Sequence, residues 1–315
     1  AELLERSVLT NNGKRMTGDS LFYDRNRGIG EAFRNVEFVD TISKNMLTGD
    51  YCFYNQLTGY AFATDKAVAT DFSQGDSLFI HADTLQLYTF HVNTDSVYRE
   101  ARAYHKVRFY RTDIQGVCDS LVFSSKDSCL TLYQDPILWN GKQQLLGEEI
   151  MVYMNDSTID WAHIQNQALS VEQLDLLNYN QVSGKDMKAY FEGGEMKQVD
   201  VDGSVRLVYF PMEKDSTLLG MNCSETSKLS MFLENRKLKK LAMSPKSNGT
   251  LYPMTQIPPA KMKLDNFAWF DYVRPLNKAD IFNWRGKGAG QELKKSTRGA
   301  APLPNQKLFE NSKKE

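Results

Sequence analysis

The stretch GDSLFYDRNRGIGEAFRNVEFVD, residues 18–40, joins two alternating apolar segments through a polar turn. Leu21 and Tyr23 are two positions apart, as are Val36 and Phe38. A period of two places side chains on one face of a β-strand. The polar residues 24–28 have the composition that closes a β-hairpin. The stretch therefore predicts two antiparallel strands that share an apolar face.

The same unit recurs along most of the chain. Close copies begin at Gly49-Asp50 and Gly75-Asp76, and weaker ones at 118, 147, 184 and 220. A second motif, A-[FY]-x-x-V-x-F, occurs at 32–38 and 103–109, with a degenerate copy at 63–69. The first apolar residues of the units are 26 to 43 positions apart: Leu21, Cys52, Leu78, Leu121, Ile150, Met187 and Cys223. Serial hairpin units predict an all-β, repeat-built stack.

The Gly-Asp pair before each strand is interpreted as a corner between one rung and the next. Glycine can adopt the positive φ that such a turn needs, and an Asp side chain can accept bonds from free backbone N–H groups. Calcium binding is the alternative for a series of aspartates. Ligands to one ion must converge, however, whereas residues one rung apart are spread along the stack. We expect neither a metal nor a cofactor.

The alternation assigns fourteen residues to the inner face of the stack. A closed sandwich would fill this face with its own side chains, whereas a partly open stack would offer an apolar trough. The alternation by itself slightly favours the closed sandwich. The predicted inner set is Leu21, Tyr23, Val36, Phe38, Cys52, Tyr54, Leu78, Ile80, Val107, Phe109, Leu121, Phe123, Ile150 and Val152.

Composition and motifs argue against several classes of function. A net charge of −1 over 315 residues gives no electrostatic reason to expect a nucleic-acid partner. The four cysteines form no C-x-x-C pair, and Cys52 and Cys223 are interpreted as small buried hydrophobes. The four histidines form no metal-binding motif, and the glycines of 286–290 lack phosphate-loop spacing. The sequence predicts no active site and no enzyme.

The repeat pattern ends near residue 243, so residues 1–243 are expected to form the β stack. Residues 244–260 are rich in Pro, Gly and Ser and predict a linker. The aromatic residues within 266–285 predict short helices on either side of Pro275, packed as a cap over the last rung around Cys223 to Leu241. Residues 244–285 thus form linker and cap, and residues 286–315 are expected to be a flexible basic tail.

The serial units G-D-x-L-x-Y-D and A-x-x-N-V-x-F resemble the OstA-like (organic-solvent-tolerance) family. The segment Asp135-Pro136-Ile137-Leu138-Trp139, which leads into the strand that starts after Gly147, adds to this similarity. The family includes LptA and the N-terminal periplasmic domain of LptD. The resemblance covers residues 10–243, and the region from Ser244 onward departs from the LptA-type pattern.

The resemblance implies a two-sheet β-jellyroll, open like a taco, in the periplasm. Its apolar groove would shield the lipid A acyl chains of lipopolysaccharide on the way to the outer membrane. The N-terminus, AELLERSVLT, has no signal-peptide pattern, and we expect that such a peptide has been removed. A structural or adhesive β-solenoid with a closed core is the competing class.

The same interpretation assigns partners to the two ends of the groove and cations to its mouth. The N-terminal edge strand is expected to recruit another Lpt-type jellyroll or a second copy by strand addition, and the cap to block the other end. Five cations are candidates for contact with lipid phosphates at the groove mouth: Arg25, Arg27, Arg34, Lys66 and Arg108.

Overall fold

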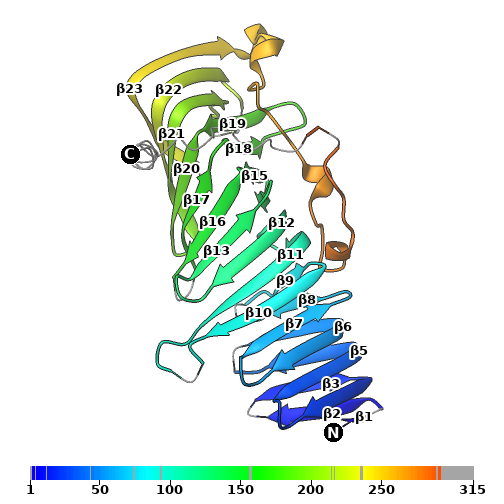
Figure 1. Ribbon diagram of the computed structural model, residues 1–315. Coiled ribbons are helices and arrows are strands. Elements are labelled where there is room, and N and C mark those ends of the chain that lie inside the picture. The colour runs from blue at the N-terminus through cyan, green and yellow to red at the C-terminus, as the bar shows by residue number, and fades with distance from the viewer. Residues whose placement is uncertain are drawn as a thin grey trace, which may run out of the picture.

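The computed structural model describes residues 2–3, 5–11, 13–42, 44–73, 75–92, 94–155, 158–213, 215, 217–234, 237–288 and 290–291. The fold is all-β, as predicted, and successive antiparallel strands stack from the N-terminal end to β23 (Figure 1). The described strands are β1 (Glu2–Leu3), β2 (Ser7–Asn11), β3 (Lys14–Gly18), β4 (Ser20–Asp24), β5 (Ile29–Asp40), β6 (Asn45–Asn55), β7 (Tyr60–Thr64), β8 (Val68–Asp71), β9 (Leu78–His81), β10 (Thr84–Phe90), β11 (Tyr98–Tyr110), β12 (Gln115–Ser124), β13 (Cys129–Tyr133), β14 (Ile137–Asn140), β15 (Gln143–Leu146), β16 (Glu149–Met154), β17 (Ile159–Gln165), β18 (Ala168–Gln173), β19 (Tyr179–Gly184), β20 (Asp186–Glu192), β21 (Glu195–Tyr209), β22 (Gly220–Glu234) and β23 (Lys237–Pro253).

The strand pairs form two series of neighbours, which we call wing I and wing II. The long strands belong to both wings, because each shifts register near its middle. Wing I runs in the order β1, β4, β5 (29–33), β6 (51–55), β7, β10, β11 (98–104), β12 (120–124), β13, β16, β17, β20, β21 (195–202), β22 (228–234), β23 (237–244). Wing II runs β2, β3, β5 (36–40), β6 (45–49), β8, β9, β11 (107–110), β12 (115–118), β14, β15, β18, β19, β21 (205–209), β22 (220–226), β23 (247–253).

The chain passes between the wings at corners built from paired residues with positive φ. The six pairs are Arg34-Asn35, Asp65-Lys66, His105-Lys106, Gln134-Asp135, Asn166-Gln167 and Gly203-Ser204. A non-glycine residue in the left-handed region costs roughly 1–2 kcal/mol. The recurrence of eleven such residues at matched positions means that neighbouring rungs must stabilise them.

The stabilising groups come from the Gly-Asp corners of the adjacent strand. The backbone N–H of Asp19 donates to the carbonyls of Phe33 and Arg34, at 3.1 and 3.0 Å, and that of Asp50 donates to Asp65 O at 2.7 Å. The carboxylate contacts the second residue of the facing pair as well: Asn35 Nδ2 donates to Asp19, and Lys66 Nζ donates to Asp50. Asp19 and Asp50 are therefore structural corners, as predicted.

The expected role of the corner glycines was wrong. None of Gly18, Gly49, Gly147 and Gly184 has a positive φ. These glycines instead allow the next rung to come close, because a Cβ on Gly147 would lie 2.5 Å from Ile164 Cγ2 and 3.2 Å from Gln165 O. The strained backbone lies on the facing strand, at residues that are mostly not glycine.

The expected alignment of the third unit was also wrong. Gly75-Asp76 lies in the turn between β8 and β9, and Asp76 accepts bonds from Thr112 rather than forming a corner. The corner of this rung is Ala82-Asp83, where the N–H of Asp83 donates to His105 O at 3.2 Å. The anchor is then Leu85, and the five intervals between Leu21 and Met187 become 31, 33, 36, 29 and 37 residues.

One unbroken cross-strand row of side chains lies beside the corners on the inner face of wing I. Each member is the direct partner of the next, and all are between 0 and 6 % exposed. This corner row consists of Leu21, Ala32, Cys52, Ala63, Leu85, Ala103, Leu121, Leu132, Ile150, Ile164, Met187, Val201 and Leu229. It forms the centre of the main apolar core.

The C-terminal region differs from the predicted linker and cap. Strand β23 continues to Pro253, so a regular strand occupies part of the expected linker. Residues 254–288, which we call the strap, contain only single-turn 3-10 helices: η1 (Met254–Gln256), η2 (Pro259–Lys261), η3 (Asp271–Val273) and η4 (Asp280–Phe282). The strap begins over β21 and β22, where Ile257 and Met262 pack beside Met221, and then runs back along the side of the stack (Figure 1). The aromatic segment therefore lies over earlier strands than predicted: Phe270 bonds Gln144 of β15, and Trp284 lies beside Arg108 of β11. Of the predicted tail, residues 289 and 292–315 lie outside the described residues.

Three glutamines on the outer face of wing II hold the strap. Gln181 donates to Met262 O and accepts from Leu264 N–H, at 2.8 and 2.9 Å. Gln144 binds Ala268 O and Phe270 N–H in the same way, at 2.9 and 2.8 Å. Further along, Gln115 accepts from the guanidinium of Arg274 at 2.9 Å. These contacts lay the strap over an apolar cluster that includes Val117, Trp139 and Phe270.

The corner geometry predicts that Gly147→Ala will lower the free energy of unfolding by about 1–3 kcal/mol, because the added methyl overpacks the contact with Ile164. Gly75→Ala is the matched control, since a Cβ there meets nothing within 4 Å and φ is not positive. It should change the free energy of unfolding by less than about 1 kcal/mol. Urea denaturation of both variants measures the difference, and equal effects would contradict this role of the corner glycines.

The glutamine contacts predict that Gln144→Ala will loosen the strap, because Ala268 O and Phe270 N–H lose their partner. Leaving buried polar groups unpaired costs about 1–3 kcal/mol. Hydrogen exchange should accelerate at Phe270, while Gln143→Ala, which alters a residue that bonds Ser170 instead, should leave exchange in the strap unchanged. Unchanged exchange in Gln144→Ala would refute the role of this clamp.

Candidate apolar site between the wings

The predicted register of the inner face is the one observed. Eight of the fourteen predicted residues belong to the buried core: Leu21, Val36, Cys52, Val107, Phe109, Leu121, Ile150 and Val152. Leu78 and Ile80 are half-buried and pack against that core. Tyr23, Phe38, Tyr54 and Phe123 are half-buried and lie two positions farther along the same strand face. Burial therefore decreases from the corners toward the hairpins.

A second inner row crosses wing I beside the corner row. On each strand it lies two positions nearer the hairpin turn. In its first half, large and small side chains alternate on neighbouring strands: Tyr23, Gly30, Tyr54, Ala61, Leu87, Ala101 and Phe123. Six of these seven are half-buried. Farther along, Val152, Ala162, Ala189 and Val199 are all between 2 and 4 % exposed. The apolar interior is thus more accessible from β4 to β13 than from β16 to β21.

Phe109 marks a point where the interior is filled by the protein itself. Its side chain is 3 % exposed, and a Cβ on Gly116 would lie 2.1 Å from the end of its ring. The phenyl ring therefore lies directly against the backbone of the neighbouring strand, and only glycine fits beneath it. A ligand that passes along the whole interior has to displace this ring or pass beside it.

The candidate cations do not gather at one mouth. Arg34 and Lys66 lie in the corners, on the closed side of the stack, and Lys66 is paired with Asp50 at 3.1 Å. Arg108 is 3 % exposed on wing II beneath the strap, where its Nε donates to Ile281 O and its guanidinium lies 5.4 Å from the Trp284 ring. Only Arg25 and Arg27, in the exposed turn between β4 and β5, lie at the hairpin side.

Arg108 and its neighbours also carry shifted pKa values. Burial lowers the pKa of Arg108 to about 10. At the strap, the hydrogen bond from Arg285 lowers the pKa of Asp280 to about 2, and Leu276 N–H also donates to that carboxylate. Arg108 ties the end of the strap to wing II, whereas the contacts of Asp280 lie within the strap itself. These groups do not line the interior.

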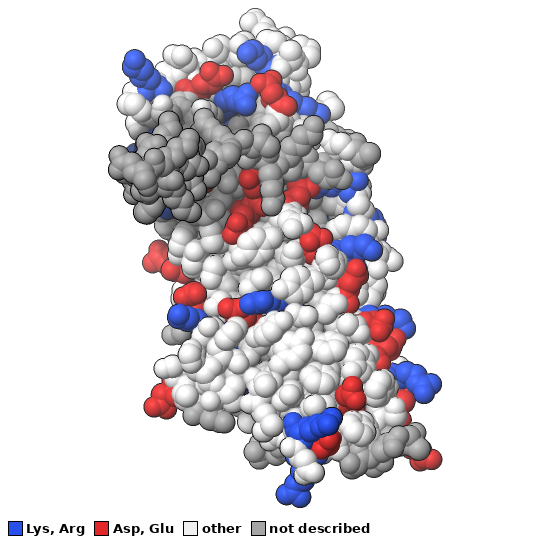
Figure 2. Space-filling model, viewed as in Figure 1, with Lys and Arg blue, Asp and Glu red and all other residues white. Residues whose placement is uncertain are grey.

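The outer face of wing I carries an aromatic surface that the sequence reasoning missed. Successive ring centroids lie 4.7 to 6.4 Å apart, and all the rings point away from the corner row. This aromatic ladder consists of Phe33, Tyr51, Phe53, Tyr60, Phe62, Tyr88, Phe90 and Tyr98. The view in Figure 2 shows uncharged side chains over much of the N-terminal half, with charged ones mainly at the margins. The sequence carries a signal for this surface: aromatic residues recur at every second position, one residue away from the apolar positions of the inner face.

The cysteines are free thiols, and three of them are buried. Burial raises the pKa of Cys52 to about 12, so this thiol behaves as a small hydrophobe, as predicted. Cys223 is only half-buried. It lies on the outer face of wing II beside Val208, where its Sγ donates to Lys261 O of the strap at 3.7 Å. Among the described residues, no group of three His, Cys, Asp or Glu side chains could hold a metal ion.

The comparisons with known proteins give no relative from which a role could be transferred. No family model matches the chain, and no curated protein matches it. Within the described part of the chain, no helix has both the length and the apolar character to cross a bilayer. The class that fold and site define is an all-β stack of antiparallel strands with a continuous apolar interior and a polypeptide strap on one outer face.

The gradient of burial predicts different thiol reactivity along the second inner row. In a Cys223→Ser background, Leu87→Cys should react with a maleimide at least tenfold faster than Ala189→Cys, because Leu87 is half-buried and Ala189 is 2 % exposed. Labelling rates followed by mass spectrometry measure the ratio. Equal rates would mean that the interior is equally closed along its length.

Proposed function

We propose that this protein is a non-enzymatic carrier of lipopolysaccharide in the periplasm, with the wings as the two sheets of an OstA-like, LptA-type β-jellyroll. The observation that carries the proposal is the half-buried second row from Tyr23 to Phe123, which adjoins an unbroken buried row. Apolar side chains that are half-covered by their own protein leave room for acyl chains to complete the burial.

The energetics suit a carrier. Each acyl methylene removed from water contributes about 0.8 kcal/mol, so a chain of a dozen carbons gains several kcal/mol from contact with successive rungs alone. The rungs present similar side chains, and a lipid can therefore occupy neighbouring positions with similar affinity. Transport of this kind requires no chemical step.

Within this proposal the lipid lies in the N-terminal half of the stack, where the interior is more accessible. Tyr54, Leu87 and Phe123 would contact acyl chains there, and Arg25 and Arg27 are placed to meet phosphates beside the first hairpin. Arg34, Lys66 and Arg108 would not contact the lipid, since they lie at the corners or beneath the strap.

The partners we propose are other jellyrolls of the same kind, or a second copy of the chain, that add a strand to an open end of the stack. Among the described strands, β2 pairs only with β3. At the other end β23 pairs only with β22, and it carries Lys239, Lys240 and Pro245, residue types that deter strand addition. The strap lies over an outer face and covers neither edge. Sedimentation velocity over a concentration series tests this association.

The alternative function is a structural or adhesive β-solenoid with a closed core. The burial of Val152, Ala162, Ala189 and Val199 favours it for the C-terminal half, where the side chains of the protein fill the interior. Under this alternative no lipid would enter the stack at any rung.

Photo-crosslinking separates the two functions. In cells that make lipopolysaccharide, a photoreactive phenylalanine in place of Tyr23 or Phe38 should capture it, because both residues lie on the inner strand face. The matched controls are the adjacent residues Phe22 and Glu37, whose side chains point outward. Equal capture at inner and outer positions, or none at either, would remove the carrier proposal.

A further inference from the structure

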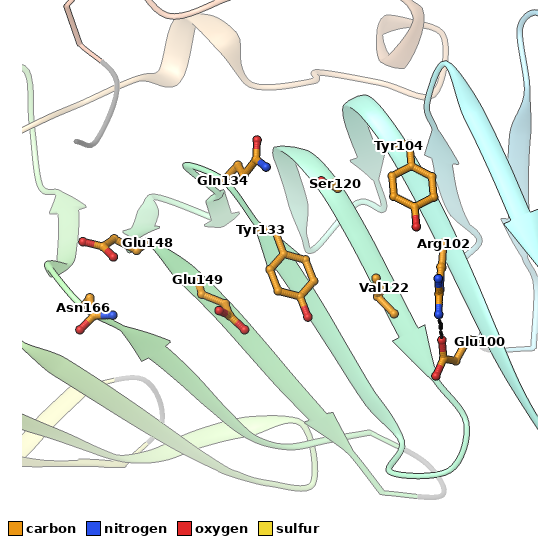
Figure 3. A pocket seen from close by; sticks show the side chains of 10 residues that line it. All are labelled: Glu100, Arg102, Tyr104, Ser120, Val122, Tyr133, Gln134, Glu148, Glu149 and Asn166. Atoms are coloured by element: carbon orange, nitrogen blue, oxygen red, sulfur yellow. Dashed lines mark hydrogen bonds and ion pairs between the residues drawn. The ribbon is translucent and has the colours of Figure 1, made fainter. Parts of the chain in front are cut away.

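A hollow of about 610 Å³ lies on the outer face of wing I, beyond the end of the aromatic ladder (Figure 3). Its floor is made by small outward side chains of β12, Ser120 and Val122. Tyr104 and Tyr133 stand on the flanking strands, and both pair directly with Ser120 in the sheet. The hollow exists because one strand with small side chains lies between two strands with long ones.

The hollow combines flat aromatic faces with groups that bind hydroxyls. Figure 3 shows the rings of Tyr104 and Tyr133 broadside, with their phenol oxygens pointing the same way along the strands. The carboxylates of Glu148 and Glu149 and the amide of Asn166 lie beyond Tyr133, at the end of the hollow away from Arg102. Two strand spacings, about 9.6 Å, separate the β11 and β13 backbones, which is wide enough for one extended chain ligand between them.

A salt bridge joins the hollow to the aromatic ladder. Arg102 donates to Glu100 at 2.6 and 3.1 Å, and its guanidinium lies 4.6 Å from the centre of the Tyr88 ring. Both hydrogen bonds go to one oxygen, Oε2 of Glu100, and together with the ring contact they fix this arginine. The lining therefore has three carboxylates against one guanidinium that is already paired, so it repels anions.

We infer that this hollow is a binding site for an uncharged, hydroxyl-rich oligosaccharide. The apolar ring faces of a pyranose stack on tyrosine, and its hydroxyls donate to carboxylates and exchange bonds with amides. A lipid chain would bring no hydroxyl to these carboxylates and amides, and a phosphorylated sugar would face three carboxylates. The site lies on the face opposite the apolar interior and does not depend on the proposed lipid transport.

The test uses the whole chain and defined probes. Maltohexaose, cellohexaose and hexameric N-acetylglucosamine serve as neutral ligands, trigalacturonate as the anionic one, and spermidine as a cation that could also suit tyrosines and carboxylates. Isothermal titration should detect binding of at least one neutral hexasaccharide. Ser120→Tyr, which fills the floor, should weaken that binding at least tenfold, while Ser230→Tyr, at a half-buried outward position elsewhere on wing I, should leave it unchanged.

Glu149→Lys provides a second variant with the same expected loss, in case the new tyrosine at position 120 perturbs folding. Urea midpoints of the variants are compared so that loss of binding is not confused with unfolding. Three results would overturn the inference: no neutral saccharide binds, Ser120→Tyr and Ser230→Tyr lose binding equally, or only trigalacturonate or spermidine binds.

Discussion

The structure depends on the hydrogen bonds that join a strained corner on one strand to a relaxed corner on the next. Pairs of residues with positive φ, such as Asp65-Lys66, turn the chain from wing I to wing II at a cost of about 1–2 kcal/mol for each residue. Asp50, on the facing strand, stabilises that turn in two ways. Its N–H donates to the carbonyl of Asp65, and its carboxylate accepts from the ammonium of Lys66. The same arrangement recurs at Asp19, where Asn35 is the side-chain partner, so each rung positions the next.

The corners also explain why the core can be continuous. Strained and relaxed corners alternate from strand to strand, and the residue two positions from each corner points inward, before the strained pair at Ala32 and after the relaxed corner at Leu21. The row from Leu21 to Leu229 is the result, and it stays at or below 6 % exposed through every rung. The strap adds a second layer on wing II, where Gln144 and Gln181 replace the sheet partners that its irregular backbone lacks and Gln115 accepts from the guanidinium of Arg274. Wing I has no such cover among the described residues of the strap, and its outer face carries aromatic rings and the polar hollow.

The alternation of apolar residues was sufficient to predict the strands, their antiparallel pairing and the inward register of Leu21 and Tyr23. It could not identify the third corner. Gly75-Asp76 matches the motif in sequence but lies in a turn, whereas the corner is formed by Ala82-Asp83, which contains no glycine. The strap was assigned to the wrong place because aromatic residues such as Phe270 indicate burial but not the surface that buries them. A signal was present: Gln115, Gln144 and Gln181 each precede an anchor by six residues, in three consecutive units. Polar residues at matched repeat positions indicate a shared contact that apolar periodicity does not reveal.

The central claim is that the half-buried inner row of the N-terminal rungs receives acyl chains. Nuclear Overhauser effects between lipid A acyl protons and methyl-labelled protein measure this contact directly. The account predicts contacts to the methyl groups of Leu87 and Leu130, which face the interior, and none to Val122, which lies on the outer face of the strand between their rungs. Contacts to Val122 alone, or no contacts to any of the three at saturating lipid, would contradict it.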